Sequence, residues 1–256
     1  MQKKYLKIKI QDKIAWISIN REEKLNALNI SMLEEIRKNL IDIRGNKEIF
    51  VVVFLGSGDK AFIAGADISE FSKYGKNKGL ELAKKGQENV LDLIENFPKP
   101  IIAGINGYAL GGGLELAMAC HLRVAVNTAK LGLPEVSLGL IPGYGGTQRL
   151  TKLVGKTNAI EMILSGEMID SEKAYALRLV NKVVKRENLI DSISEIANKI
   201  MKNSPNAIAK AIEAINAAEK NPEGFEIEKE KFSECFESKD FKEGVSAFLD
   251  KRKPRF

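Results

Sequence analysis

Two glutamates in apolar surroundings are the residues of this sequence best suited to acid–base chemistry. Glu115 follows three consecutive glycines and lies among leucine, alanine and methionine, and Glu135 follows Pro134 in the stretch LGLPEVSLGLIPG. Apolar surroundings disfavour a charged carboxylate and raise its pKa towards neutrality, where it can both accept and donate a proton. The simpler interpretations are that Glu115 interacts with a helix dipole and that Glu135 lies in a surface turn.

Two glycine-containing segments could supply backbone donors to the same chemistry. Gly111–Gly113 precede LELAM, which favours helix, and a helix start presents unpaired N–H groups that glycines leave accessible. The segment 64–66, Ala-Gly-Ala, could supply a second donor, and two such donors stabilise an oxygen that becomes negative during reaction. Taken singly, the triple glycine is equally typical of a tight turn, and the segment 64–66 is more typical of an ordinary loop between a strand and a helix.

Composition limits the kinds of function that the chain can have. The 256 residues are 44% hydrophobic and carry a formal charge of +6, which suits anionic small molecules better than a dedicated nucleic-acid site. The only histidine is His121, so a Ser-His-Asp triad or a multi-histidine metal centre would depend on that single residue. Neither a G-x-G-x-x-G nor a Walker-type glycine motif occurs. The acid–base groups of an enzyme would therefore be carboxylates.

Cysteine usage and apolar patterning predict a cytoplasmic protein. The two cysteines, Cys120 and Cys235, form no CxxC pair, which is typical of a reduced compartment. The amino-terminal residues alternate charged and apolar types and do not resemble a signal peptide. No run of about 18 apolar residues predicts a membrane span.

The periodicity of apolar residues predicts an α/β chain with a helical end. We expect a hairpin at 5–20, a helix at 31–44 with Ser31 and Glu34 as its capping box, and a buried strand at 49–57. A loop at 59–71 leads to a helix, and a longer helix covers 80–96. Further strands and helices alternate up to about 184, and from 186 onwards only helices follow, with starts near Glu187, Ser204, Pro222 and Lys239.

Five segments together resemble the enoyl-CoA hydratase (crotonase) family. They are REEKLNALN, DKAFIAGADISEF, PKPIIAGINGYALGGGLELAMACHLRVA, LGLPEVSLGLIPGYGGTQRL and EGVSAFLDKRKPRF, in order along nearly the whole chain. The resemblance implies a spiral of ββα turns. It also implies a core with the active site in residues 1–190 and a helical region in 191–256 that builds a homotrimer or a homohexamer.

The resemblance assigns a role to each of these segments. It implies that the amides of Ala66 and Gly112 hold the thioester oxygen, and that Glu115 and Glu135 are the catalytic acids. It further implies contacts with substrate or CoA from Lys24, Leu25, Ala27, Ala64, Ala66, Asp67, Ile68, Ser69, Gly111, Gly112, Tyr144, Phe248 and Lys251.

The implied reaction is reversible syn addition of water to a short trans-2-enoyl-CoA, without a metal or a separate cofactor, because CoA is part of the substrate. Glu115 would remove a proton from water, and Glu135 would supply the proton at C2. An enoyl-CoA isomerase or a decarboxylase of the same superfamily is the first alternative, although these generally do not need both glutamates. A non-enzymatic RNA-binding relative is the second, and no aromatic–basic interleaving supports it. A glycosidase also uses two carboxylates, but only one tryptophan is present for stacking on sugars.

Two positions depart from the family pattern. His121 stands where many relatives carry an acid, and we expect a structural role for it. Tyr144 lies at a variable position and could touch the pantetheine or shape the acyl pocket. The variable segment 71–86 is expected to set the depth of that pocket.

Overall fold

The larger of two sheets begins with the expected hairpin. The computed structural model describes residues 4–219 and 223–256. Strands β1 (Leu6–Gln11) and β2 (Ile14–Ile19) pair antiparallel across a turn at Asp12 and Lys13, both of which have positive φ. Strands β3 (Val51–Gly56), β5 (Ile101–Ile105), β7 (Leu122–Val126) and β10 (Lys182–Val184) then add in parallel, in the order β1-β2-β3-β5-β7-β10. The apolar runs of β3 and β5 are buried, as expected of central parallel strands.

The smaller sheet determines where the candidate site lies. It contains β4 (Ala61–Ala64), β6 (Tyr108–Leu110), β8 (Lys130–Gly132) and β9 (Ile169–Asp170) in that order. Strands β4, β6 and β8 are parallel, and each follows a strand of the larger sheet, β3, β5 and β7. The chain therefore winds as a spiral of ββα turns, which confirms the predicted fold class.

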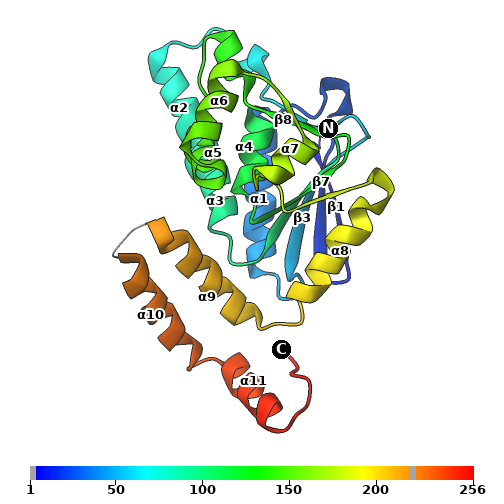
Figure 1. The fold of residues 1–256 in the computed structure, drawn as a ribbon, viewed down its shortest axis with the longest axis vertical. Coiled ribbons are helices and arrows are strands. Elements are labelled where there is room, and N and C mark those ends of the chain that lie inside the picture. The colour runs from blue at the N-terminus through cyan, green and yellow to red at the C-terminus, as the bar shows by residue number, and fades with distance from the viewer. Residues whose placement is uncertain (1–3, 220–222) are drawn as a thin grey trace.

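Helices cover the two sheets (Figure 1). In the body these are α1 (Ile30–Gly45), α2 (Lys76–Gly86), α3 (Asp92–Glu95), α4 (Gly112–Ala119), α5 (Gly146–Val154), α6 (Lys156–Ser165), α7 (Ser171–Ala176) and α8 (Leu189–Ile200). A π-helical turn at Gln87–Leu91 joins α2 to α3, so the expected helix at 80–96 is three segments. Short 3-10 helices lie at Glu22–Lys24, Ile68–Glu70, Pro134–Leu138, Arg186–Asn188 and Ala217–Glu219.

The carboxy-terminal helices form an arm that extends away from the sheets (Figure 1). The arm consists of α9 (Pro205–Asn216), α10 (Glu223–Cys235) and α11 (Lys239–Leu249). The expected starts of α9 and α11 are confirmed, because the side chains of Ser204 and Ser238 cap them; the expected start at Pro222 lies outside the described residues. Helix α8 packs instead on the larger sheet through Leu189, Ile193 and Ala197, and the division at residue 190 stays a prediction.

Two local expectations were wrong. Helix α1 begins at Ile30, not after Ser31, because the Asn29 side chain accepts a hydrogen bond of 2.8 Å from the Met32 amide and Glu70 holds the Ile30 amide. The segment expected as a loop at 59–71 contains β4 and a short 3-10 helix. The first error comes from a local competitor, since Asn29 caps the helix in place of Ser31, and the second from pairing of β4 with the distant strand β6. In the part of the chain that the structure describes, no helix is both long and apolar enough to cross a membrane.

Candidate active site

Three segments of the site leave the same edge of the smaller sheet. Because β4, β6 and β8 are parallel neighbours, their carboxyl ends at Ala64, Leu110 and Gly132 lie side by side. The Gly111 amide donates to the Gly132 carbonyl at 2.9 Å, which ties the second segment to the third. The fold therefore brings together the Ala-Gly-Ala loop, the triple glycine and the segment containing Glu135, which are far apart in the sequence.

The two expected backbone donors each follow a glycine with positive φ. Gly65 has φ 101° and precedes Ala66, and Gly111 has φ 49° and precedes Gly112. Within the described residues, the amide of neither Ala66 nor Gly112 donates a hydrogen bond, and both residues line one cavity. Gly112 is also the first residue of α4, where the helix dipole adds positive potential. Two unpaired donors at one cavity can stabilise a developing oxyanion.

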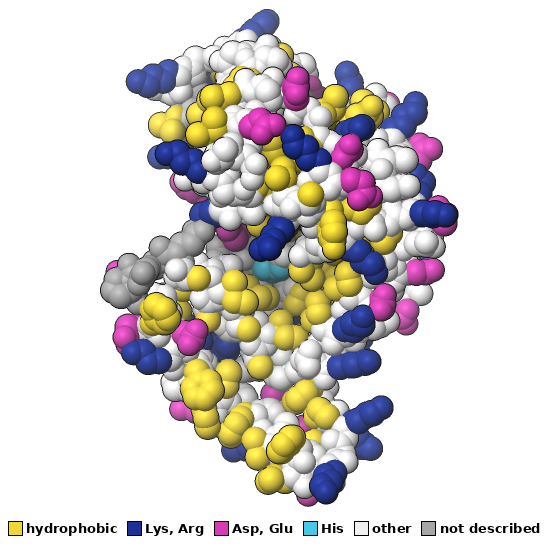
Figure 2. All heavy atoms as spheres, viewed as in Figure 1, with side chains coloured by type: hydrophobic (Ala, Val, Ile, Leu, Met, Phe, Trp, Pro, Cys, Tyr) yellow, Lys and Arg dark blue, Asp and Glu magenta, His cyan; other side chains and the backbone are white. Residues whose placement is uncertain are grey.

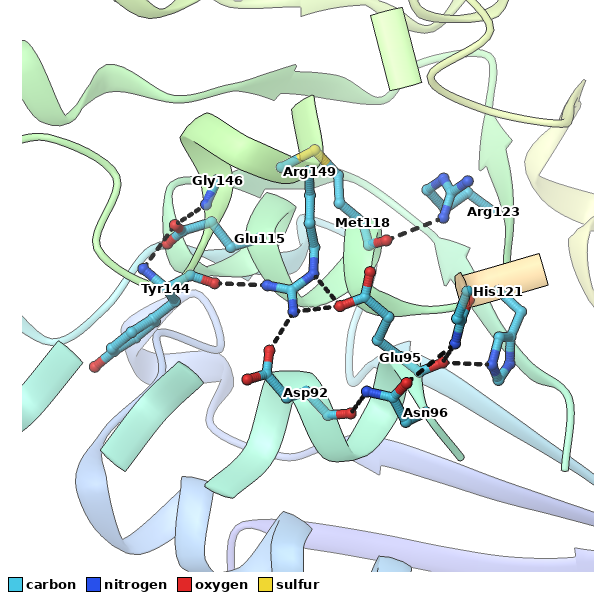
Figure 3. A network of polar contacts seen from close by, with 11 residues as sticks. Asp92, Glu95, Asn96, Glu115, Met118, His121, Arg123, Tyr144, Gly146 and Arg149 are labelled. Carbon is cyan, nitrogen blue, oxygen red and sulfur yellow. Dashed lines mark hydrogen bonds and ion pairs between the residues drawn. The ribbon is translucent and has the colours of Figure 1, made fainter. Parts of the chain in front are cut away.

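Glu115 is held by a turn of the backbone. Its side chain is in the first turn of α4, and the residue is 2% exposed. Its Oε1 accepts hydrogen bonds of 2.8 Å from the amides of both Tyr144 and Gly146 (Figure 3). Burial, and then the negative charge of Glu135, raise the pKa of Glu115 to about 7, although the two amide bonds act in the opposite direction. Glu115 can therefore change its protonation state near neutral pH.

Glu135 faces the same cavity with an unpaired oxygen. It lies at the start of the 3-10 helix that follows β8, and its Oε2 is buried without a hydrogen-bond partner in the described protein. A buried acceptor without a hydrogen-bond partner typically lowers the free energy of unfolding by about 1–3 kcal/mol, so this arrangement reduces the stability of the fold. Burial raises the pKa of Glu135 and favours the protonated form, which can donate to a reacting carbon.

The cavity has a volume of about 440 Å³ and walls that are mostly apolar. The expected depth-setting segment does supply part of the wall, through Phe71, Tyr74, Gly79, Leu82 and Ala83. The remaining apolar wall comes from Ile68, Leu110, Leu138, Leu140, Ile141 and Tyr144. Such a cavity suits an apolar chain whose reactive end reaches two carboxyl groups and two amide donors.

The expected contacts near the amino terminus lie beside the first donor loop. The Ala64 amide donates to the Leu25 carbonyl, and the Leu28 amide donates to the Gly65 carbonyl at 2.9 Å. This pairing places the segment containing Lys24, Leu25 and Ala27 next to the loop. Asp67 caps the following turn, and hydrogen bonds from Ser69 and Arg21 lower its pKa to about 2.

Phe248 and Lys251 are not brought to the cavity of their own chain. Phe248 is in α11, is 83% exposed, and does not line the cavity; Lys251 follows the same helix. Their expected role with substrate remains a prediction.

His121 crosslinks backbone segments, in agreement with the expected structural role. Its Nδ1 accepts from the Ile101 amide at 2.8 Å, so the proton is on Nε2, which faces the Glu95 carbonyl at 3.1 Å. Burial lowers the pKa of His121, which keeps this neutral form. Within the described residues, no group of three or more His, Cys, Asp or Glu side chains could hold a metal ion.

Sequence reasoning missed a partly buried ion-pair network next to Glu115. Arg149 in α5 contacts Asp92 and Glu95 of α3 (Figure 3). The sequence shows Arg149 three residues after Gly146, and it shows Asp92 and Glu95 spaced at i, i+3 on another expected helix. Their pairing across 54 residues or more was not.

Comparison with known proteins gives a consistent result. A family model described as enoyl-CoA hydratase/isomerase matches residues 9–256. The short-chain-enoyl-CoA hydratase of Clostridium acetobutylicum is 41% identical over 95% of this chain and 94% of that protein. The crotonyl-CoA hydratase of Syntrophomonas wolfei is 40% identical over 96% and 95%. A crystal structure of enoyl-CoA hydratase from Bacillus anthracis superposes with a TM-score of 0.93 at 37% identity, covering 99% of both chains.

Proposed function

The chain belongs to the enoyl-CoA hydratase/isomerase family, and we propose that it is a hydro-lyase that adds water reversibly to a trans-2-enoyl-CoA to give a 3-hydroxyacyl-CoA. The names of its relatives favour short substrates such as crotonyl-CoA. The observation that carries the proposal is one cavity lined by two unpaired backbone donors and two carboxyl groups with raised pKa.

The mechanism follows from the chemistry of these groups. The amides of Ala66 and Gly112 hold the thioester oxygen, which becomes negative as water attacks C3, and one such donor is typically worth about 3–4 kcal/mol of barrier. Ionised Glu115 removes a proton from the attacking water, and protonated Glu135 delivers a proton to C2. In the dehydration direction the two acids exchange roles. The two amides supply the polarisation that a Lewis acid would give, so we propose that neither a metal nor a separate cofactor takes part.

The test is turnover of crotonyl-CoA and of longer 2-enoyl-CoA esters, followed through loss of the conjugated thioester absorbance. We expect turnover that survives dialysis against EDTA. A folded protein that hydrates none of these esters would refute the proposal. Isomerisation of a 3-enoyl-CoA without hydration would favour the isomerase alternative instead.

We propose that the arm assembles copies of this chain into a trimer or a hexamer in the cytoplasm. Its helices and the following turn expose large apolar side chains, among them Ile215, Phe225, Phe232, Phe236, Val245, Phe248 and Leu249. Figure 2 shows apolar side chains along this arm and in the groove between arm and body. Burying such a surface against other copies is the simplest way to remove it from water. In such an assembly Phe248 and Lys251 would contact the CoA bound to a neighbouring chain.

A further inference from the structure

The two amides that hold Glu115 come from the turn at residues 143–146, in which Tyr144 is the one residue that is not glycine. The turn contains Gly143, Gly145 and Gly146, and Gly145 has φ 91°. A Cβ on Gly146 would lie 2.8 Å from Glu115 Oε1, so glycine is required there. A glycine-rich turn has more conformational freedom than any other sequence, and fixing it requires external contacts.

Arg149 supplies those contacts from inside the protein. Its Nη1 donates to the Tyr144 carbonyl at 2.9 Å, which belongs to the same residue whose amide binds Glu115. Its Nη2 contacts Asp92 at 2.6 Å and Glu95 at 2.7 Å, and its Nε donates to Glu95 at 3.1 Å. Arg149 is buried, whereas its partners Asp92 and Glu95 are partly exposed, and contacts between charged groups are stronger than neutral hydrogen bonds.

The acidic side of this network is itself anchored. The Glu95 carbonyl faces His121 Nε2 at 3.1 Å and accepts from the Asn216 side chain of α9 at 2.7 Å. The end of α3 is therefore fixed from the body and from the arm. Arg149 transmits that fixed position to the turn at 144–146.

We propose that Arg149, held by Asp92 and Glu95, is a positioning residue for Glu115 in the hydration reaction. This inference rests on the proposed function. With Oε1 engaged by the turn, Oε2 is left to bind the attacking water, because no donor among the described residues reaches it. Arg149 does not line the cavity, so it acts on the acid and not on the binding of substrate.

The charge of Arg149 gives the proposal a signature in pH. Among the residues that the structure describes, three titratable groups interact with Glu115: Glu135, which raises its pKa, Arg149, which lowers it, and Tyr144. The charge of Arg149 and the two amide hydrogen bonds both lower the pKa of Glu115. Removing the guanidinium removes the first effect and weakens the second, so the pKa of Glu115 should rise. The acidic limb of kcat should therefore move to higher pH, and a merely structural residue would not move it.

The experiment compares Arg149→Gln with Arg123→Gln. Arg123 is an equally buried arginine that donates to backbone carbonyls at the far end of α4 and has no contact with the turn. For Arg149→Gln we expect kcat to fall about 100-fold, as for a displaced catalytic group, with KM within about threefold and the acidic limb at higher pH. For Arg123→Gln we expect lower thermal stability with the acidic limb unchanged. Arg149→Lys keeps the positive charge but lacks the planar guanidinium that binds several acceptors at once. The acidic limb of the kcat profile should therefore lie near its wild-type pH, while kcat stays low.

Several results would overturn the inference. Wild-type kcat and pH profile in folded Arg149→Gln would do so, as would an identical limb shift in Arg123→Gln. If the Arg149 variants do not fold, Asp92→Asn decides, because Asp92 is half-exposed and Glu95 still holds the guanidinium. We expect a smaller fall in kcat, because the guanidinium loses one of its two acidic partners, and an unchanged kcat would refute the inference.

The proposed function can fail separately. If the wild type hydrates no enoyl-CoA, titration of the Glu115 carboxyl by carbon-13 NMR still shows whether Arg149 and Asp92 set its pKa. An unchanged Glu115 titration in Asp92→Asn and in folded Arg149→Gln would then refute the positioning role.

Discussion

The two glutamates of the cavity differ in what surrounds their oxygens. Glu115 Oε1 accepts two amide hydrogen bonds, whereas Glu135 Oε2 has no partner within the described protein. The first arrangement tolerates a negative charge, and the second favours a proton. This difference assigns the base and the acid of the hydration direction.

Glu135→Gln should abolish proton delivery and leave the cavity intact. A positioned acid or base contributes about 100- to 10,000-fold, and we expect a fall in kcat of that size. Binding of a saturated acyl-CoA, measured by calorimetry, should change little because the amide keeps the size of the side chain. Full turnover in this variant would remove Glu135 from the mechanism.

The pH profile of hydration should be bell-shaped. Ionised Glu115 is the base, so kcat rises with pH as Glu115 loses its proton at about 7. Glu135 must be protonated, so kcat falls as that carboxyl ionises, and burial raises its pKa above the usual range. Glu115→Gln should remove the acidic limb from any residual rate, and an unaltered limb would show that another group titrates there.

Glu115 also makes stability depend on pH. Its folded pKa of about 7 exceeds the ordinary value of 4.5, so the folded state binds more protons between these values. Folding stability contributed by this group is present below pH 4.5 and is lost as pH rises through 7. As pH rises from 4.5 to about 7, the melting temperature of Glu115→Gln should increase relative to that of the wild type. A constant difference between the two would contradict the raised pKa.

At the scale of elements, the sequence predicted strands and helix starts better than their tertiary partners. Glycine and Asp170 mark the starts of α5 and α7 locally, because Gly145 and Asp170 directly precede these helices. The strands β6 and β9 have three and two residues, and they exist because β8 pairs with them. Such short pairings leave no periodicity to detect.

The parts of the candidate site that depend on residue type and local spacing were predictable from the sequence. Glu115, Glu135 and the two glycine-containing segments were visible from residue types, whereas the roles of the amides came from a family resemblance. The link from Arg149 to Glu95 joins positions 54 residues apart, and no local pattern connects them. The direction of a side chain across such a separation is set by the packed structure alone.

Gly86 at the end of α2 and Tyr144 together limit the depth of the cavity. The Tyr144 ring packs so closely on Gly86 that a Cβ there would overlap it, and it also lies beside Gly112. Tyr144→Ala should therefore admit longer acyl chains, raising kcat/KM for medium-chain esters relative to crotonyl-CoA by about 10-fold or more, since each methylene is worth about 1–3 kcal/mol. Tyr144→Phe is the matched control and should keep the wild-type ratio. A wild-type ratio in Tyr144→Ala would place the limit elsewhere.

At the scale of the whole molecule, the arm determines the proposed assembly. Phe232 is 66% exposed and packs edge-on against Phe236 in the same chain. Phe232→Asp should lower the mass measured by sedimentation to that of smaller species, because a charge cannot be buried unpaired in an apolar contact. Lys229→Gln on the same helix is the control and should sediment as wild type. An unchanged mass for Phe232→Asp would exclude this face of α10 from the contact.

Both donors of the cavity belong to the main chain, and each is aimed by the glycine before it. Any side chain except that of proline at residue 66 keeps the backbone donor, and so does replacement of a neighbouring carboxyl group. Evolution can therefore exchange the acids or reshape the walls, and so reach a new reaction of a thioester, while inheriting anion stabilisation unchanged. Anion stabilisation is therefore insensitive to most side-chain replacements, but it depends on the two glycines, Gly65 and Gly111, that precede the donors.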